Sequence, residues 1–210
     1  MAGKVITVAQ QKGGSGKTTL AVNLAVAFGR RGLTVALLDT DPQGSLGRWF
    51  MARRERLGAA GMEFSTASAW GVSYECEKLR KVVDIVLVDT PPKVDADLRP
   101  ALREADLILV PVAASHVDLW ATEGVLDLAA RERKRATIVL NRAKAGTRLA
   151  EEVALAAAEL SAELMAARFA NRVVYAETLG QGLGAQEAGR SAATTEVEAM
   201  AEEVLALLAD

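Results

Sequence analysis

The sequence is poor in the residues that form disulfides, metal clusters and aromatic cores. Its 210 residues include a single cysteine, Cys76, and a single histidine, His116, and only 4% are aromatic. One cysteine excludes an intramolecular disulfide and a cysteine-based zinc or iron–sulfur site, and one histidine excludes a site of several histidines. Aliphatic side chains and alanine must therefore fill the core.

Long apolar runs and a strong net charge are also missing. The longest stretch without a charged residue runs from Thr18 to Gly29, well short of the roughly 18 residues of a membrane-spanning helix. No basic and apolar leader opens the chain, so we do not expect secretion. The formal net charge of −2 argues against coating of nucleic acid by the whole surface. These absences predict a cytoplasmic protein with a single domain, residues 1–210.

Short aliphatic runs alternate with helical stretches along the chain. Strands are predicted at residues 5–9, 34–39, 84–89, 107–112 and 137–141, and helices at 17–31, 45–57, 73–81, 95–104, 117–134, 148–165 and 194–210. Continuously apolar strands are typical of parallel sheets that are covered on both faces. The alternation predicts an α/β fold, a doubly wound and mostly parallel sheet with helices on both faces. Ligands of such sheets bind beyond the carboxyl ends of the strands, where Asp39, Asp89 and Asn141 fall.

A glycine-rich segment, residues 10–19 (QQKGGSGKTT), joins the first strand to the first helix. Its glycines let consecutive N–H groups turn toward phosphate oxygens, and the helix adds its positive N-terminal end. In a P-loop, Lys17 reaches the β- and γ-phosphates and the Thr18 hydroxyl binds Mg²⁺. The other residues expected to contact the nucleotide are Gly13, Gly14, Ser15, Gly16 and Thr19. Gln11 replaces the first glycine of the usual pattern, but the GKTT core still predicts a phosphate site rather than an incidental turn.

Lys12 extends this motif. With the residues that follow it, KGGSGKTT resembles the deviant Walker A motif of the ParA/MinD family. The resemblance implies a P-loop NTPase fold, ATP and Mg²⁺ as cofactors, and a homodimer that forms with ATP. It also implies that Lys12 crosses to the phosphates bound by the other subunit, where its charge supports phosphoryl transfer together with Lys17. Gln10 departs from the family, which often has asparagine there.

Two acidic segments resemble further motifs of this family. Residues 39–44 (DTDPQG) resemble its DxDPQG segment, which implies that Asp41 orients the attacking water and Asp39 supports the Mg²⁺ shell. Residues 89–92 (DTPP) resemble its Walker B end, which implies that Asp89 holds Mg²⁺ through a water. A strand-end aspartate alone is about as often a turn or cap residue, so the assignment depends on the order of the three segments.

Two later segments resemble the nucleoside side of the family's site. Asn141 and Arg142 resemble its adenine-contacting position, and an amide can donate to and accept from a purine edge. A strand-end asparagine is also commonly a turn residue. Residues 172–177 (RVVYAE), with Gly180 and Gly182, resemble the family's later nucleotide-side loop.

The resemblance implies a small ParA-like ATPase, a switch in DNA partition or intracellular cargo positioning. Such a protein hydrolyses ATP slowly, binds duplex DNA without sequence preference, associates with the nucleoid, and responds to a ParB-like or cargo-adaptor protein. We expect no operator-reading extension before the first strand, and no membrane partner, because the last helix is acidic. Two alternatives stay open. One is a P-loop metabolic enzyme, such as a nucleotide-dependent ligase or kinase, and the other is a non-hydrolysing nucleotide-binding scaffold.

Basic residues are concentrated in one part of the chain. Residues 131–172 contain nine Lys/Arg against five Asp/Glu, whereas residues 176–210 contain one against seven. Nonspecific DNA binding needs clustered cations that displace counterions from phosphates. By resemblance to the family, the candidate DNA contacts are Lys144, Arg148, Arg168 and Arg172. A second group lies at the C-terminal end of a predicted helix, where cations commonly only complement the helix dipole: Arg131, Arg133, Lys134 and Arg135.

Overall fold

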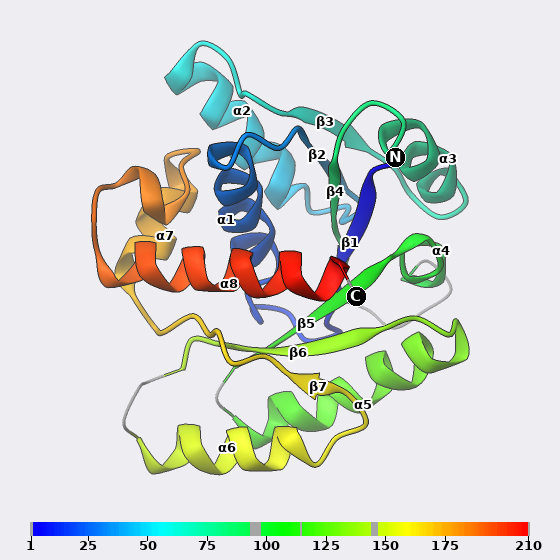
Figure 1. Cartoon of the computed structure of the whole chain (residues 1–210), viewed down its shortest axis with the longest axis vertical. Helices are drawn as coiled ribbons and strands as arrows, with labels where there is room; N and C mark the ends of the chain where they lie inside the picture. Colours follow the sequence, from blue (N-terminus) through cyan, green and yellow to red (C-terminus); the bar gives the residue numbers. More distant parts are fainter. Residues whose placement is uncertain (1, 93–97, 114, 144–146, 210) are drawn as a thin grey trace.

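The computed structural model describes residues 2–92, 98–113, 115–143 and 147–209. Its strands form one sheet in the order β3-β2-β4-β1-β5-β6-β7, and every neighbouring pair runs parallel (Figure 1). The strands are β1 (Lys4–Val8), β2 (Val35–Asp39), β3 (Glu63–Thr66), β4 (Ile85–Asp89), β5 (Leu107–Ala113), β6 (Ala136–Asn141) and β7 (Glu163–Leu164). The predicted parallel sheet is confirmed.

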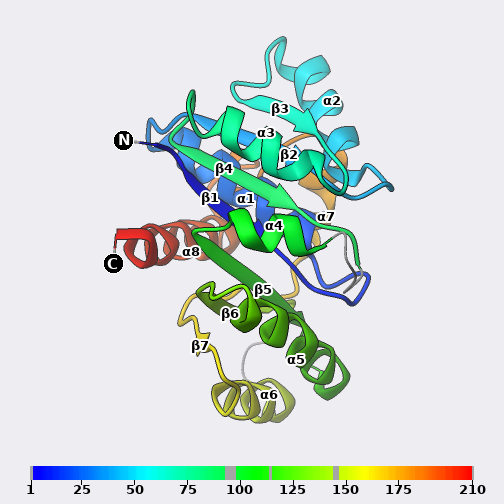
Figure 2. The same ribbon diagram turned by 90° about the vertical axis from the view of Figure 1, so that its right-hand side faces the viewer.

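Helices cover both faces of this sheet. They are α1 (Lys17–Arg30), α2 (Ser45–Leu57), α3 (Gly71–Leu79), α4 (Leu98–Glu104), α5 (His116–Arg131), α6 (Arg148–Ala158), α7 (Val173–Gly180), the 3-10 turn η1 (Ala185–Glu187) and α8 (Ala192–Ala209). Helices α1, α2, α7 and α8 share one apolar cluster, whereas α3 to α6 pack on the other side of the sheet (Figures 1 and 2). No helix in the described ranges is long and apolar enough to span a bilayer.

Strand β1 shows why the central strands are largely apolar. Successive side chains of a strand point to opposite faces of the sheet. Here Ile6 joins the cluster that contains α1, whereas Val5 joins the cluster that contains α3, and both side chains are fully buried. Because both faces are covered, every position of the strand after the exposed Lys4 is buried.

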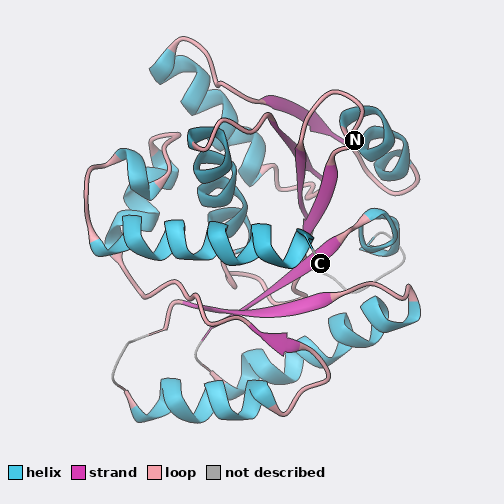
Figure 3. Ribbon diagram, viewed as in Figure 1, coloured by secondary structure: helices cyan, strands magenta, loops and turns pink. Residues whose placement is uncertain are grey.

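The predicted helix over residues 148–165 is wrong in its last part. Helix α6 ends at Ala158, and Glu163–Leu164 pairs with Thr137–Ile138 of β6 as the edge strand β7 (Figure 3). Alanine favours helix locally, but a longer helix would leave the backbone groups along this edge of β6 without partners. The sequence patterns do not predict β3, α7 or η1, and the predicted helix at 95–104 is described only from Leu98 onward.

The parallel arrangement brings the polar strand ends to one edge of the sheet. Asp39 and Asp89 are register partners on β2 and β4, and Val8, which ends β1, is the register partner of Asp89 on the other side. The loop after β1 therefore starts beside both carboxylates. This geometry places the predicted phosphate loop and the predicted acidic residues in one site.

Candidate functional site

The segment 10–19, the phosphate loop, leads into the N-terminal end of α1. Gly14 and Gly16 have φ of +77° and +91°, a left-handed conformation that glycine adopts without strain. Gly16 is the N-cap of α1, and this cap makes no side-chain hydrogen bond. The first N–H groups of the helix are therefore available to a ligand, which is the arrangement that binds an anion.

Lys17 places a positive charge inside this loop. Its side chain is buried, and Nζ donates a hydrogen bond of 3.1 Å to the carbonyl of Gln10. Burial lowers the pKa of Lys17, and the negative charges of Asp89 and Asp41 oppose that shift. A buried ammonium group with one carbonyl acceptor is poorly compensated, so an anionic ligand in the loop would stabilise it.

Thr18 and Asp89 form the second polar contact of the site. The Thr18 hydroxyl donates to Oδ2 of Asp89 at 2.6 Å, while Oδ1 of Asp89 has no hydrogen-bond partner among the described residues. Burial raises the pKa of Asp89 to about 7, and the hydrogen bond from Thr18 opposes the shift. A hydroxyl beside a carboxylate with an unused oxygen is a hard oxygen donor set of the kind that Mg²⁺ takes. The two residues therefore fit this ion.

The site contains few other protein donors for a cation. Within the described ranges, no three Asp, Glu, His or Cys side chains gather into a metal-binding cluster. Mg²⁺ in nucleotide sites is commonly held by one or two protein groups, with water and phosphate oxygens completing the shell. The sparse donor set agrees with a cation that arrives with a nucleotide.

Asp39 and Asp41 shape the turn after β2. Oδ1 of Asp39 accepts from the N–H of Asp41 at 3.0 Å, and Oδ2 accepts from the N–H of Gly47 at 2.9 Å. Burial raises the pKa of Asp39, and these two hydrogen bonds oppose the shift. Asp41 accepts in turn from the N–H of Gln43 at 2.9 Å. Asp39 thus orients the segment that carries Asp41, and its role toward Mg²⁺ stays a prediction.

The first residues of the phosphate loop are attached to α5. Nζ of Lys12 lies 2.8 Å from Oδ2 of Asp118. Gln11 donates to the carbonyl of Ala121, and Gln10 donates to the hydroxyl of Thr122 at 3.0 Å. Three consecutive loop residues therefore contact one helix. Gln10, where the family often has asparagine, has a buried structural role here.

Asn141 contacts the phosphate loop from the end of β6. Its Nδ2 donates to the carbonyl of Ser15 at 2.7 Å, and its Oδ1 accepts from the N–H of Arg142 at 2.9 Å. The approach requires a glycine, since a Cβ at Gly16 would lie 2.0 Å from Nδ2 of Asn141. In this structure the amide holds the loop, and its predicted contact with adenine stays a prediction.

A cavity of about 150 Å³ lies beside the phosphate loop. Its lining residues come from α1, the end of β6, and α7 with the segment before it: Thr19, Asn141, Arg142, Ala170, Asn171, Arg172, Tyr175, Ala176 and Leu179. The two later segments with a family resemblance, at residues 141–142 and 172–177, therefore meet here. Their meeting place is next to the loop expected to hold phosphates.

The candidate DNA contacts occupy different surroundings. Lys144 lies outside the described residues. Arg148 is exposed at the start of α6 and pairs with Glu152 at 2.7 Å, and Arg168 is exposed. Arg172 lines the cavity and pairs with Glu196 at 2.7 Å. Arg172 thus has structural contacts of its own, and its assignment to DNA stays a prediction.

Asp118 was not identified from the sequence as part of this site. Its only signal is its place in the first turn of a helix that follows a buried strand, and many acidic residues occupy such positions because of the helix dipole. The Ser15 hydroxyl, which is buried without a hydrogen-bond partner among the described residues, was expected as a contact of the nucleotide. An anionic ligand in the loop would offer it an acceptor.

Comparisons with known proteins agree with this geometry. A model of the CobQ/CobB/MinD/ParA nucleotide-binding domain matches residues 6–196. The chain is 30% identical to maintenance of carboxysome distribution protein A of Halothiobacillus neapolitanus over 95% of both chains. It is 35% identical to the chromosome-partitioning ATPase Soj of Thermus thermophilus over 60% of this chain and 59% of the relative. The solved ATP complex of a Cyanothece McdA variant shares the fold, with a TM-score of 0.79, 17% identity and coverage of 99% of this chain and 97% of that one.

Proposed function

The chain belongs to the CobQ/CobB/MinD/ParA family of nucleotide-binding domains, and from this premise we propose a Mg²⁺-dependent ATPase that dimerises with ATP to position or partition a cargo. The observation that carries the proposal is the phosphate loop. It contains Lys12 and Lys17, and its next residue, Thr18, donates a hydrogen bond to Asp89. The names of the two relatives, which concern carboxysome distribution and chromosome partitioning, support the class of function.

Binding of the triphosphate follows from the loop. The N–H groups at the start of α1 would donate to phosphate oxygens. The Lys17 ammonium group would donate to a phosphate oxygen in place of the Gln10 carbonyl. Thr18 and Asp89 would hold Mg²⁺, which on binding neutralises charge on the β- and γ-phosphates. Lys17 and the N-terminal end of α1 are fixed positive groups in the phosphate loop. They would stabilise the negative charge that develops while the γ-phosphoryl group is transferred to water.

Asp41 is suited to act on the attacking water. Its backbone is fixed by Asp39, and one of its oxygens accepts from the N–H of Gln43. It follows Asp39, the register partner of Asp89, by two residues, which supports a place near the phosphate end of the site. A carboxylate held there can accept a hydrogen bond from water and direct the oxygen toward the γ-phosphate.

Lys12 gives the proposal its dimeric form. In the single chain its ammonium group contacts Asp118, whereas the Lys17 side chain lies inside the phosphate loop and contacts the Gln10 carbonyl. With 41% of its side chain exposed, Lys12 is accessible to a second molecule and could contact phosphates there. A cation placed in this way acts like an arginine finger supplied in trans. Turnover would then require a dimer.

Duplex DNA and a stimulating partner complete the proposed cycle. The ATP-bound dimer would bind the nucleoid through paired basic surfaces, with Arg148 and Arg168 as exposed candidates. A ParB-like or cargo-adaptor protein would stimulate hydrolysis and release the dimer. The proposal includes no membrane partner.

The test combines oligomeric state with nucleotide binding. In an Asp41→Ala background, light scattering should show a dimer with Mg²⁺ and ATP and a monomer with ADP. Lys17→Ala should weaken ADP binding about 100-fold through lost charge-assisted hydrogen bonds. Lys12→Ala should bind ADP normally and stay monomeric with ATP, whereas Lys78→Ala, an exposed lysine on α3, should match the parent.

The same assays separate the alternatives. A metabolic ligase or kinase would need a second substrate for turnover and would be indifferent to Lys12. A scaffold would bind ATP without releasing phosphate at any DNA or protein concentration. An ATP-independent dimer that tolerates Lys12→Ala would contradict the proposed mechanism.

A further inference from the structure

Helix α7 forms one wall of the cavity beside the phosphate loop, and each end of this wall is tied to a carboxylate. Near its start, Glu196 of α8 accepts from Arg172 at 2.7 Å and from the Tyr175 hydroxyl at 2.7 Å. Past its end, the chain runs through residues 181–187, where Glu187 makes the second anchoring contact. The contacts of Glu187 therefore fix the segment that follows α7.

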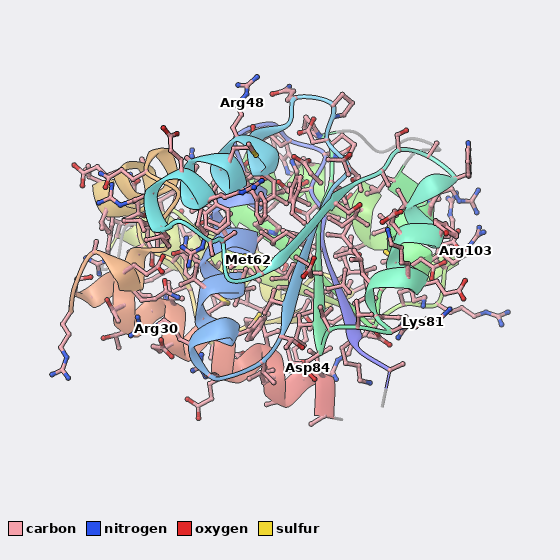
Figure 4. All side chains as sticks on the ribbon, turned by 90° about the horizontal axis from the view of Figure 1, so that it is seen from above. Arg30, Arg48, Met62, Lys81, Asp84 and Arg103 are labelled. Carbon is pink, nitrogen blue, oxygen red and sulfur yellow. The ribbon has the colours of Figure 1, made fainter. Side chains whose placement is uncertain are left out.

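Arg53 of α2 is the partner of Glu187. Its Nη1 and Nη2 donate to the two carboxylate oxygens at 2.7 and 2.9 Å, a bidentate pair. Nη1 also donates to the carbonyl of Gly182 at 3.2 Å, and Nε donates to the carbonyl of Ala60 at 2.8 Å. The guanidinium stands 5.4 Å from the ring centroid of Trp49. This arginine is buried, whereas Arg48 on the same helix extends away from the protein (Figure 4).

The segment 182–187 also touches α2 through its backbone. Gly182 has φ of +70°, and a Cβ there would lie 2.2 Å from the backbone nitrogen of Arg53. The indole of Trp49 donates to the carbonyl of Leu183 at 3.2 Å. The segment therefore fits against α2 in one close arrangement, with Arg53 and Trp49 supplying the hydrogen bonds.

Asn23 of α1 connects the same segment to the cavity. Its Oδ1 accepts from the N–H of Ala185 at 2.8 Å, and its carbonyl accepts from the Gln186 amide at 3.0 Å. Its Nδ2 donates to the carbonyl of Thr19 at 2.8 Å, and Thr19 lines the cavity. Contacts thus run without interruption from α2 through residues 182–187 to the phosphate-loop helix.

We propose that Arg53 is a positioning residue for nucleotide recognition, which acts through Glu187 and Gly182 to fix α7 and thereby the cavity wall for the nucleoside. The inference rests on the proposed nucleotide function, because it takes the cavity as the nucleoside side of that site. Arg53 makes no hydrogen bond to the phosphate loop among its contacts in the described residues. Its loss should therefore affect the nucleoside and spare the phosphates.

Removal of this arginine would leave the half-buried carboxylate of Glu187 without its cation. A partly desolvated charge that loses its bidentate partner is unfavourable, so the surrounding segment would rearrange to let water reach the carboxylate. Residues 182–187 would then lose their fixed place on α2, and α7 would lose its C-terminal anchor. A displaced wall no longer offers its contacts to a base or ribose, whereas the loop from Gln10 to Thr19 keeps its own hydrogen bonds.

The experiment compares ADP with inorganic pyrophosphate, both with Mg²⁺, by titration calorimetry of the full chain. The proposed dimer requires ATP, so dimerisation does not contribute to the affinity for either ligand. The ratio of the two affinities therefore reports what the nucleoside adds to binding. We expect Arg53→Ala and Glu187→Gln to reduce this ratio about tenfold, since a few hydrogen bonds at about 1 kcal/mol each are at stake. Pyrophosphate affinity should stay within about twofold.

Controls distinguish positioning from a loss of folding. Arg56→Ala removes an exposed arginine from the same helix and should leave both affinities unchanged. Arg53→Lys keeps the charge but not the bidentate pair, so it should lie between the parent and Arg53→Ala. If Arg53→Ala proves unfolded by circular dichroism, Glu187→Gln and Arg53→Lys provide the comparison.

Three results have different meanings. A parent protein that binds ADP no better than pyrophosphate would contradict the proposed nucleotide function itself. A parent with a clear preference for ADP that Arg53→Ala and Glu187→Gln retain would overturn the role of Arg53 alone. Equal losses for both ligands would also overturn it, because they would indicate general damage to the fold.

Discussion

Lys12 and Asp118 form an ion pair in which only one partner is accessible to solvent. Nζ lies 2.8 Å from Oδ2, and 41% of the Lys12 side chain is exposed against 4% of the Asp118 side chain. One ammonium group cannot contact this buried carboxylate and also reach phosphates in a second subunit. In the proposed function, the ion pair therefore opposes the ATP-bound dimer.

This relationship predicts that Asp118→Asn strengthens dimerisation. When Lys12 leaves, the parent protein retains a buried carboxylate without its cation, which is unfavourable by several kcal/mol. Asparagine carries no charge and removes that penalty. In an Asp41→Ala background with Mg²⁺ and ATP, the dimer dissociation constant should fall about tenfold or more, as measured by sedimentation velocity.

Asp127→Asn is the matched control, because Asp127 is an exposed acid on the same helix. It should leave the dissociation constant unchanged, and ADP affinity should be the same in all variants. A weaker dimer in Asp118→Asn would show the opposite role, in which Asp118 directs Lys12 toward the partner.

Asn141 allows a test of two roles for one amide. In the structure it donates to the carbonyl of Ser15, so its removal should loosen the loop that would hold the phosphates. Asn141→Ala should then weaken ADP and pyrophosphate alike, each about fivefold to tenfold for one lost buried hydrogen bond. Calorimetry that showed a loss for ADP alone would instead favour the contact with adenine.

Asp89 should make the ligand-free protein less stable as the pH rises. Its pKa is about 7 in the folded chain, against 3.8 for an ordinary aspartate, because burial disfavours the charged form. Between these values the folded state binds more protons than the unfolded state, so the free energy of unfolding falls with increasing pH. Chemical denaturation at pH 5 and pH 8 should show this loss in the parent protein.

Asp89→Asn removes the titration and serves as the comparison. It should be more stable than the parent at pH 8, by more than ~1 kcal/mol, and the difference should shrink toward pH 5. The same variant should lose Mg²⁺-dependent nucleotide binding. A parent and a variant with parallel pH profiles would show that Asp89 stays ionised in the free protein.

The DNA contacts need a test that avoids the cavity. Arg172 pairs with Glu196 and lines the cavity, so its reversal to glutamate would disturb more than a surface charge. Arg148→Glu with Arg168→Glu should reduce ATP-dependent binding of an arbitrary duplex about tenfold or more and lower its salt dependence. Arg54→Glu with Arg56→Glu, at two exposed positions of α2, is the charge-matched control, and fluorescence anisotropy with a scrambled duplex checks sequence independence.

The central strands and the phosphate loop could be predicted because their local signals agree with the fold. The five aliphatic runs are buried on both faces except at Thr34 and Asp84, and Gly14 and Gly16 of the phosphate loop adopt the left-handed conformation. Strand β3 could not be found in this way, because Glu63–Thr66 lies at the edge of the sheet and has no buried residue. Strand β7 has two residues, too few for any period.

The contacts of the site depended on tertiary structure. Asp89 and Thr18 are far apart in sequence, and only the parallel register of β1 and β4 brings them together. Asp118 and Arg53 belong to no sequence motif. The role of each depends on a contact with a residue distant in sequence: Asp118 contacts Lys12, and Arg53 contacts Glu187. Residue type and spacing predicted what the loop can bind, but not what holds the loop and its neighbouring wall in place.

The strand order also determines when the site can form during synthesis. Strand β1 pairs with β4 and β5, whereas β2, the next strand in the chain, pairs with β3 and β4. The residues of the phosphate loop therefore leave the ribosome long before residues 85–89 and 107–109, which give β1 its neighbours. Asn141, which holds the loop, follows later still. A nascent chain shorter than about two thirds of the protein would therefore lack a finished phosphate site. Nucleotide can stabilise only a chain in which β4 and β5 have already paired with β1.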